Sequence, residues 1–246
     1  MLPNSTIEIL PTPADLFQAA AEEFTRVGNT AIAARGRFTV ALSGGSTPKS
    51  LYSLLAANYP DFKWNQTFLF FGDERHVPPD GADSNFRMVN ETLLKKISIP
   101  PENVFRVKAE NPDAAAVAAD YNAQIAKFFA LKRNQFPHFD LIFLGMGPDG
   151  HTASLFPGSA GLKERSKPVI ANWVEKFKTY RISFTFPVLN HAAEVIFLAS
   201  GPDKADMVKQ VLEGDNHPPL PAQQVRLENG ELIWMLDQAA ASKLKR

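Results

Sequence analysis

Short, almost wholly apolar runs alternate with stretches of helical periodicity, and this alternation constrains the fold of the 246-residue chain more than any other feature. A strand without a polar side is buried on both faces, which is typical of parallel sheets covered by helices. We therefore predict an α/β fold with a largely parallel, Rossmann-like sheet that is flanked by helices on both faces. The expected strands occupy residues 37–42, 66–72, 139–145, 194–200 and 231–236.

The helical stretches begin and end at residues that favour those positions. Thr12 is a good N-cap, Pro13 suits the first helical position, and Gly36 suits a helix end. We expect Thr47 and Asp83 to cap two later helices in the same way. The expected helices occupy residues 11–36, 43–59, 83–97, 111–132 and 201–214.

The chain has no internal repeat and no low-complexity linker. Its one proline-dense stretch, residues 215–225, lies between two expected elements, and we interpret it as a surface loop rather than a boundary. Residues 1–246 are therefore predicted to form a single domain.

Composition excludes several functions. The 26 Lys and Arg residues balance 26 Asp and Glu residues, so long-range attraction to nucleic acid or an acidic membrane is not expected, and any anion must be bound locally. Without cysteine the chain has no disulfide, iron–sulfur cluster or thiol nucleophile. No apolar run approaches the ~20 residues of a membrane helix, and the first residues do not resemble a signal peptide. We expect a cytoplasmic protein.

Unusual residues follow the predicted strands, at the edge where open parallel sheets bind ligands. After the first strand, two glycines let the backbone approach a ligand, and hydroxyl groups beside a helix start favour a small anion site. A plain tight turn with a helix cap is the alternative. The segment is not a Walker loop, because G-x-x-x-x-G-K-[ST] is absent. The residues of this candidate anion loop are Ser43, Gly44, Gly45, Ser46 and Thr47.

Ionisable residues follow the second strand, where Asp73, Glu74, Arg75 and His76 are consecutive. Four such groups together favour a site, although a solvated surface turn is an alternative for Glu74 or His76 taken singly. Lys204 lies in the first turn after the fourth strand, where the helix dipole disfavours a cation, so an anion is expected nearby.

One cation also stands in an apolar stretch. Arg181 belongs to residues 179–190, which we expect to be a half-buried strand that ends at Pro187. An arginine in such a strand is seldom unpaired. It could form a salt bridge or bind a phosphate or carboxylate, and the pattern favours neither.

Residues 145–150 match the dinucleotide motif G-x-G-x-x-G. The acidic residue that this motif needs about 20 positions later is absent from residues 165–172, and Asp149 would face the pyrophosphate. The next residue is His151. We interpret the loop as one that exposes this histidine to a ligand, because imidazole can transfer protons in both directions near neutral pH.

Other catalytic patterns are missing. No H-x-x-H or H-E-x-x-H spacing predicts a metal site, and no G-x-S-x-G predicts an acyl-enzyme serine. No metal and no cofactor are therefore expected.

Five segments in order resemble the 6-phosphogluconolactonase family, the lactonases of the pentose phosphate pathway. They are ALSGGSTPKSLY, FFGDERHVPPDGADSNFRMV, DLIFLGMGPDGHTASLFPG, RISFTFPVLNHA and SGPDKADMV. The resemblance implies an α/β fold shared with glucosamine-6-phosphate deaminases and related to ribose-5-phosphate isomerases.

Deaminases are the main alternative, since they resemble this chain at residues 43–48, at Asp73 and Glu74, and at residues 149–151. A deaminase, however, has a glutamate five residues after its histidine, where this chain has Phe156, and a tyrosine where this chain has Arg75. Both differences favour the lactonase. A non-catalytic sugar-phosphate binder on the same fold is the third possibility.

The resemblance implies hydrolysis of 6-phospho-D-glucono-1,5-lactone to 6-phospho-D-gluconate, by a monomer or weak homodimer. His151 would activate water and then protonate the ring oxygen, while Asp73 would orient substrate or water. The phosphate would be bound by the candidate anion loop, Arg181 and Lys204, with Arg75 as a further cation near the substrate.

Overall fold

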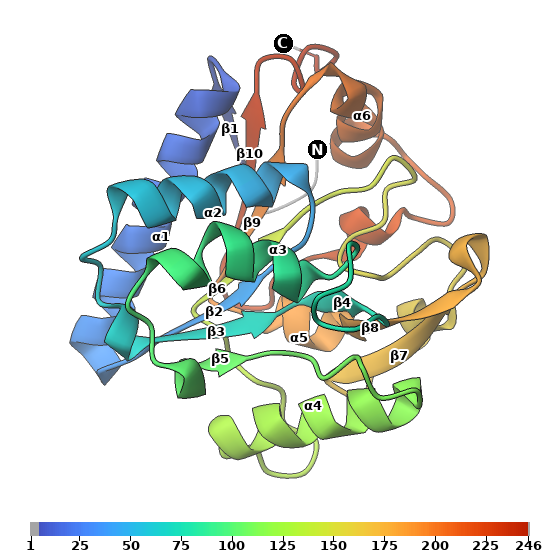
Figure 1. Ribbon diagram of the computed structural model, residues 1–246. Helices are drawn as coiled ribbons and strands as arrows, with labels where there is room; N and C mark the ends of the chain where they lie inside the picture. Colours follow the sequence, from blue (N-terminus) through green and yellow to red (C-terminus); the bar gives the residue numbers. More distant parts are fainter. Residues whose placement is uncertain (1–4, 246) are drawn as a thin grey trace.

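The computed structural model describes residues 5–245, in which seven parallel strands form the main sheet in the order β1-β10-β9-β6-β2-β3-β5 (Figure 1). Each of these strands predicted from the sequence is present, and the first strand along the chain and the short strand at residues 104–105 are additions. The strands are β1 (Ser5–Leu10), β2 (Phe38–Leu42), β3 (Thr67–Phe71), β5 (Val104–Phe105), β6 (Leu141–Leu144), β9 (Glu194–Ala199) and β10 (Glu231–Asp237).

Successive side chains of a strand point to opposite faces of the sheet, and here they are apolar on both faces. Helices therefore cover both faces. Phe38 of β2 packs edge-on against Phe24, whereas Phe70 of β3 packs against Phe128 on the opposite face. Phe24 belongs to the helix α1 and Phe128 to α4, so the predicted fold class is confirmed (Figure 1). The helices are α1 (Pro13–Arg35), α2 (Ser46–Asn58), α3 (Asn85–Thr92), α4 (Ala114–Phe128), α5 (Phe186–Asn190) and α6 (Ala205–Glu213).

A second sheet was not predicted. It is antiparallel and joins β4 (Asp73–Arg75), β8 (Thr179–Phe184) and β7 (Val169–Val174) in that order. The expected strand at residues 179–190 therefore ends at Phe184. Pro187 lies in the first turn of α5, where its missing N–H is tolerated.

The helix caps are partly as predicted. Thr12 accepts a hydrogen bond from the backbone N–H of Asp15, and Gly36 ends α1 at φ 71°. The predicted cap at Thr47 is wrong, because Gly45 at φ 110° precedes α2 and no side chain caps that helix. The predicted cap at Asp83 is also wrong, since Ser84 accepts the hydrogen bond at the start of α3.

Only the first half of the proline-dense stretch, residues 215–225, is a surface loop. Its first residues are exposed, but Ala222 and Val225 are buried. The N–H of Ala222 donates to the carbonyl oxygen of Gly150 at 3.0 Å, so the stretch supports the glycine loop that precedes His151. None of the helices within residues 5–245 has the length and hydropathy needed to span a bilayer.

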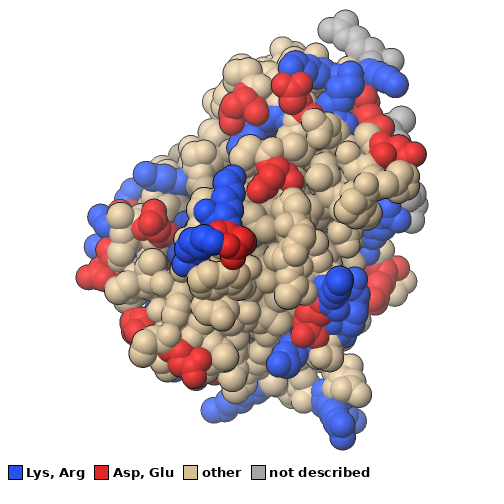
Figure 2. Space-filling model, turned by 90° about the vertical axis from the view of Figure 1, so that its right-hand side faces the viewer, with Lys and Arg blue, Asp and Glu red and all other residues tan. Residues whose placement is uncertain are grey.

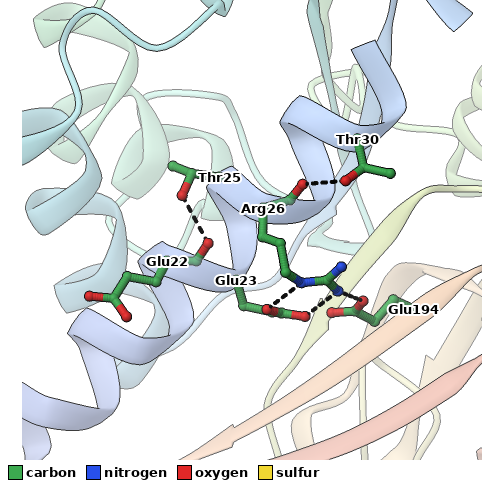
Figure 3. A network of polar contacts seen from close by, with 6 residues as sticks. All are labelled: Glu22, Glu23, Thr25, Arg26, Thr30 and Glu194. Atoms are coloured by element: carbon green, nitrogen blue, oxygen red, sulfur yellow. Dashed lines mark hydrogen bonds and ion pairs between the residues drawn. The ribbon is translucent and has the colours of Figure 1, made fainter. Parts of the chain in front are cut away.

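An ion pair between the exposed Arg26 of α1 and the buried Glu194 connects this helix to the amino end of β9 (Figure 3). Arg26 donates to Glu23 at 2.7 Å and to Glu194 at 2.9 Å. Burial raises the pKa of Glu194 to about 8, and the nearby charge of Glu23 adds to this. The pKa of Glu23 is lowered by its hydrogen bond to Arg26.

Glu194→Gln should remove a pH dependence of stability. The native state holds the Glu194 proton more tightly than the unfolded chain does, so the free energy of unfolding should fall as pH rises from 4.5 to about 8. The free energy of unfolding of Glu194→Gln should not show this fall. At pH 9 it should be higher than that of the wild type by on the order of 1 kcal/mol. Urea unfolding at pH 5, 7 and 9 measures it, with the exposed Glu22→Gln as control. Parallel slopes for wild type and Glu194→Gln would contradict the expectation.

Candidate active site

The carboxyl ends of β9, β6, β2 and β3 are neighbours in the sheet, and the loops that leave them surround a cavity of about 270 Å³. The cavity lies between β6 and β2, the point at which the order of the strands in the sheet reverses. Open α/β folds commonly bind ligands at this point. All the residues predicted for the site line this cavity: Ser43, Gly44, Gly45, Ser46, Thr47, Asp73, Arg75, His151, Arg181 and Lys204.

The loop after β6 folds so that the imidazole of His151 lies over Gly147. The N–H of Gly147 donates to the carbonyl oxygen of His151 at 2.9 Å, and Gly150 turns the chain at φ 73°. A Cβ atom at position 147 would be 2.0 Å from the imidazole. Glycine is therefore required at this position to leave room for the ring, which explains part of the apparent dinucleotide motif.

Asp149 orients that imidazole. Its carboxylate accepts hydrogen bonds from the backbone N–H of His151, at 3.2 Å, and from Nδ1 of the same residue. Partial burial opposes ionisation of Asp149, but the interaction with His151 outweighs it and lowers the pKa of the carboxyl below its ordinary value. With Nδ1 donating to a carboxylate, Nε2 of the neutral ring carries the free lone pair.

This role of Asp149 was not predicted from the sequence, where the residue was considered only for its repulsion of a pyrophosphate. The spacing D-x-H within a glycine turn was the available signal.

Phe156 supports the other side of the imidazole. Its ring stacks on that of His151 with the centroids 4.0 Å apart and an angle of 25° between the planes. Phe156 is buried, so the stacked pair holds the imidazole between an aromatic surface and the backbone of Gly147.

Asp73 is buried at the wall of the cavity and does not form an ion pair with Arg75 or Arg181. Ser154 donates to one carboxylate oxygen at 2.7 Å, and Asn85 donates to the other at 3.2 Å. A Cβ on Gly44 would meet the amide oxygen of Asn85 at 1.9 Å, so this glycine lets the anion loop and the start of α3 approach each other. No pattern in the sequence predicts that Ser154 and Asn85 bond to Asp73.

The solvated-turn alternative is wrong for Glu74, whose side chain is buried beneath α3. Its carboxylate accepts from the backbone N–H groups of Asn85 and Phe86, both at 2.8 Å. Burial raises its pKa, and these hydrogen bonds oppose the rise. Glu74 therefore positions the helix and does not line the cavity, while His76 bonds the carbonyl oxygen of Asn111 at the surface.

Arg75 and Arg181 are paired directly across the antiparallel strands β4 and β8. Like charges in this arrangement repel. Arg75 donates to the carbonyl oxygen of Asp83 at 2.7 Å, while the buried Nε of Arg181 has no hydrogen-bond partner. Burial and the charge of Arg75 lower the pKa of Arg181. The salt-bridge alternative for Arg181 is therefore wrong, since no carboxylate within residues 5–245 pairs with it.

The anion loop offers further unused donors. The hydroxyl of Tyr52 fixes the backbone of Ser43 on both sides, at 2.9 and 3.0 Å, while Oγ of Ser43 is buried without a partner. Lys204 has only a weak contact with Asp203 at 3.4 Å. Buried polar atoms without partners are uncommon, and these donors are of the kind that an anion could engage.

Opposite charges are interspersed on the face of the molecule in Figure 2, in agreement with the neutral net charge. Attraction of an anion therefore depends on the local arginines and lysine. Within residues 5–245, no cluster of three or more His, Asp or Glu side chains is placed to hold a metal ion.

Comparison with known proteins identifies the family. The family model of glucosamine-6-phosphate isomerases/6-phosphogluconolactonase matches residues 11–234, and the chain belongs to this family. The 6-phosphogluconolactonase of Nostoc sp. is 38% identical over 98% of this chain and 99% of its own, and the human 6-phosphogluconolactonase is 40% identical over 86% and 82%.

Solved structures agree with the relatives. The 6-phosphogluconolactonase from Trypanosoma cruzi has a TM-score of 0.89 at 30% identity and matches 100% of this chain and 99% of its own. A monomeric glucosamine-6-phosphate deaminase has a TM-score of 0.79 at 20% identity over 97% of this chain and 100% of its own, which shows a shared fold only.

Gly147→Ala should displace the imidazole of His151 from Asp149, because the added Cβ would overlap the ring. We expect the hydrogen bond to Nδ1 to be lost, as seen in the ¹⁵N NMR signals of the imidazole, while thermal unfolding stays cooperative. Gly145→Ala is the matched control, since its Cβ would meet only a carbonyl oxygen at 3.8 Å. Unchanged imidazole signals in Gly147→Ala would show that the ring is not held as described.

Proposed function

We propose that this protein is a hydrolase that opens a cyclic ester of a sugar phosphate. The particular reaction is that of the relatives, the conversion of 6-phospho-D-glucono-1,5-lactone to 6-phospho-D-gluconate by a 6-phosphogluconolactonase. One observation carries the proposal: an oriented imidazole and two arginines without carboxylate partners line the same cavity.

The hydrogen bond between Asp149 and His151 supports a role in proton transfer. With Nδ1 engaged, Nε2 of His151 accepts a proton from the water that attacks C1 of the lactone. The tetrahedral intermediate then collapses, the bond between C1 and the ring oxygen breaks, and the imidazolium returns the proton to that oxygen. The new carboxylic acid ionises near neutral pH and releases one proton per turnover.

The remaining residues bind and orient the substrate in this proposal. Arg181, Lys204 and the loop of residues 43–47 hold the phosphate, which aligns the lactone carbonyl with the imidazole. Arg75 lies beside Arg181 and attracts the phosphate or the developing oxyanion. Asp73 is fixed by Ser154 and Asn85, and it orients the substrate or the attacking water.

The position of Phe156 favours the lactonase over the deaminase. A deaminase would need a glutamate here to polarise its histidine, whereas the Phe156 ring stacks on the imidazole and leaves Asp149 as its hydrogen-bonded carboxylate. A non-catalytic binder would retain the cations without needing the oriented imidazole.

Three further parts of the proposal concern the setting of the reaction. We assign it to the oxidative pentose phosphate pathway and to the cytoplasm, although an Arabidopsis thaliana relative, 42% identical, is named chloroplastic. A single domain over residues 1–246 and a monomer or weak homodimer stay predictions; residues 1–4 and 246 lie outside the described part of the chain.

A pH-stat assay tests the reaction. Freshly generated 6-phosphogluconolactone should release one proton per molecule faster with the enzyme than without it, and glucosamine 6-phosphate should yield no ammonia. Ammonia release without proton release from the lactone would identify a deaminase. Inactivity on both substrates together with binding of 6-phosphogluconate would identify the non-catalytic binder.

His151→Ala should lower kcat by about 10²–10⁴-fold, the usual contribution of general acid–base catalysis, with KM nearly unchanged. Steady-state proton release measures both constants. His217→Ala is the matched control because His217 is exposed in the proline-dense stretch and does not line the cavity. A kcat equal to that of the wild type would remove His151 from the mechanism.

A further inference from the structure

An aromatic residue at the tip of the β7–β8 hairpin reaches the cavity. Phe177 ends the short 3-10 turn Glu175–Phe177 and lines the cavity wall, although its ring is 46% exposed. No role for Phe177 was predicted from the sequence. Singly exposed apolar residues are common on protein surfaces, so it is the place of Phe177 in the cavity lining that gives its ring a bearing on the site.

The hairpin does not need the Phe177 side chain in order to turn. The N–H of Lys178 donates to the carbonyl oxygen of Glu175, and Lys178 takes the left-handed conformation at φ 50°. These are backbone features that a change of the neighbouring side chain leaves in place. Phe177 can therefore be altered without removing the element that carries Arg181.

The ring of Phe177 contacts two parts of the candidate site. It packs edge-on against Phe156, with the centroids 5.8 Å apart, and Phe156 stacks on the catalytic candidate His151. It also lies under the guanidinium of Arg181, whose central carbon is 5.3 Å from the ring centroid. The ammonium of Lys176 lies 5.5 Å from the same centroid.

The contact with Arg181 is the one with an electrostatic consequence. Arg75 stands opposite Arg181 and repels it, no carboxylate pairs with it, and its buried Nε has no hydrogen-bond partner. The π face of Phe177 attracts the guanidinium at short range, in addition to the longer-range attraction of the carboxylates of Asp73, Asp83 and Glu74. Without the ring, Arg181 would be free to rotate away from Arg75 and from the cavity.

We propose that Phe177 is a positioning residue that holds the guanidinium of Arg181 ready for the substrate phosphate and thereby sets the preference for phosphorylated over unphosphorylated ligands. The ring lowers the conformational entropy that is lost on binding, because the Arg181 side chain is already ordered when the anion arrives. This inference rests on the proposed function, since it takes the anion to be the phosphate of the lactone and of its product.

The test measures binding of the product separately from turnover. Calorimetry gives the dissociation constants of 6-phosphogluconate and gluconate, and the pH-stat gives kcat and KM for phosphorylated and unphosphorylated gluconolactone. The variants are Phe177→Leu, which removes the π face, Phe177→Tyr, which keeps it, and Arg181→Ala, which sets the size of the full loss.

The control is Tyr180→Leu. Tyr180 is on the same hairpin and is 41% exposed, but it packs against Trp173 and does not line the cavity. It therefore reports any general effect of removing an exposed aromatic ring from this hairpin.

Phe177→Leu should weaken 6-phosphogluconate binding about tenfold and raise KM for the phosphorylated lactone by a similar factor, with kcat within about threefold of the wild type. Affinity for gluconate and KM for the unphosphorylated lactone should stay unchanged. Phe177→Tyr should restore wild-type binding, and Tyr180→Leu should not differ from the wild type.

Three results would overturn the inference. They are unchanged binding in Phe177→Leu, an equal loss for phosphorylated and unphosphorylated ligands, and a loss of the same size in Tyr180→Leu. If the wild type binds 6-phosphogluconate and loses that binding in Phe177→Leu but does not hydrolyse the lactone, the inference stands and the proposed reaction fails. A wild type that binds neither ligand would remove the anion site and the inference with it.

Discussion

The site depends on two guanidiniums that the fold holds opposite each other without a carboxylate between them. The register of β4 and β8 fixes Arg75 against Arg181, and the repulsion between them remains uncompensated by any ion pair within residues 5–245. A protein retains such an arrangement where a ligand supplies the missing negative charge. The antiparallel sheet that carries both arginines is thus as important to the site as the larger parallel sheet.

In the proposed mechanism, phosphate binding and proton transfer use different parts of the same cavity. The cations come from β4, β8 and the turn after β9. The imidazole of His151 lies between Gly147 and Phe156 and is bonded at Nδ1 to Asp149. Each of these contacts limits a different motion of the ring. An imidazole held in this way needs little rearrangement to meet a substrate whose phosphate is already bound.

Much of this could be predicted from the sequence because the signals were local. Apolar runs gave the parallel strands, Thr12 and Gly36 gave the ends of α1, and the unusual residues after each strand gave the lining of the cavity. The failures involve contacts between distant segments. The strand β4 has three ionisable residues and no apolar pattern, and it exists because β8, more than 100 residues later, pairs with it. The cap of α3 depended on which of two adjacent polar residues, Asp83 or Ser84, faced the helix, and α2 begins after Gly45 without a side-chain cap.

The sequence by itself determined the α/β class, the order of the elements and the residues that follow the strands, because hydrophobic periodicity and turn chemistry act over a few neighbouring residues. Only the tertiary structure decided that Arg181 has no salt bridge and that Glu74 is buried beneath a helix. Those outcomes depend on strand register and on which side chains burial brings together. Neither is encoded by the spacing of residues along the chain.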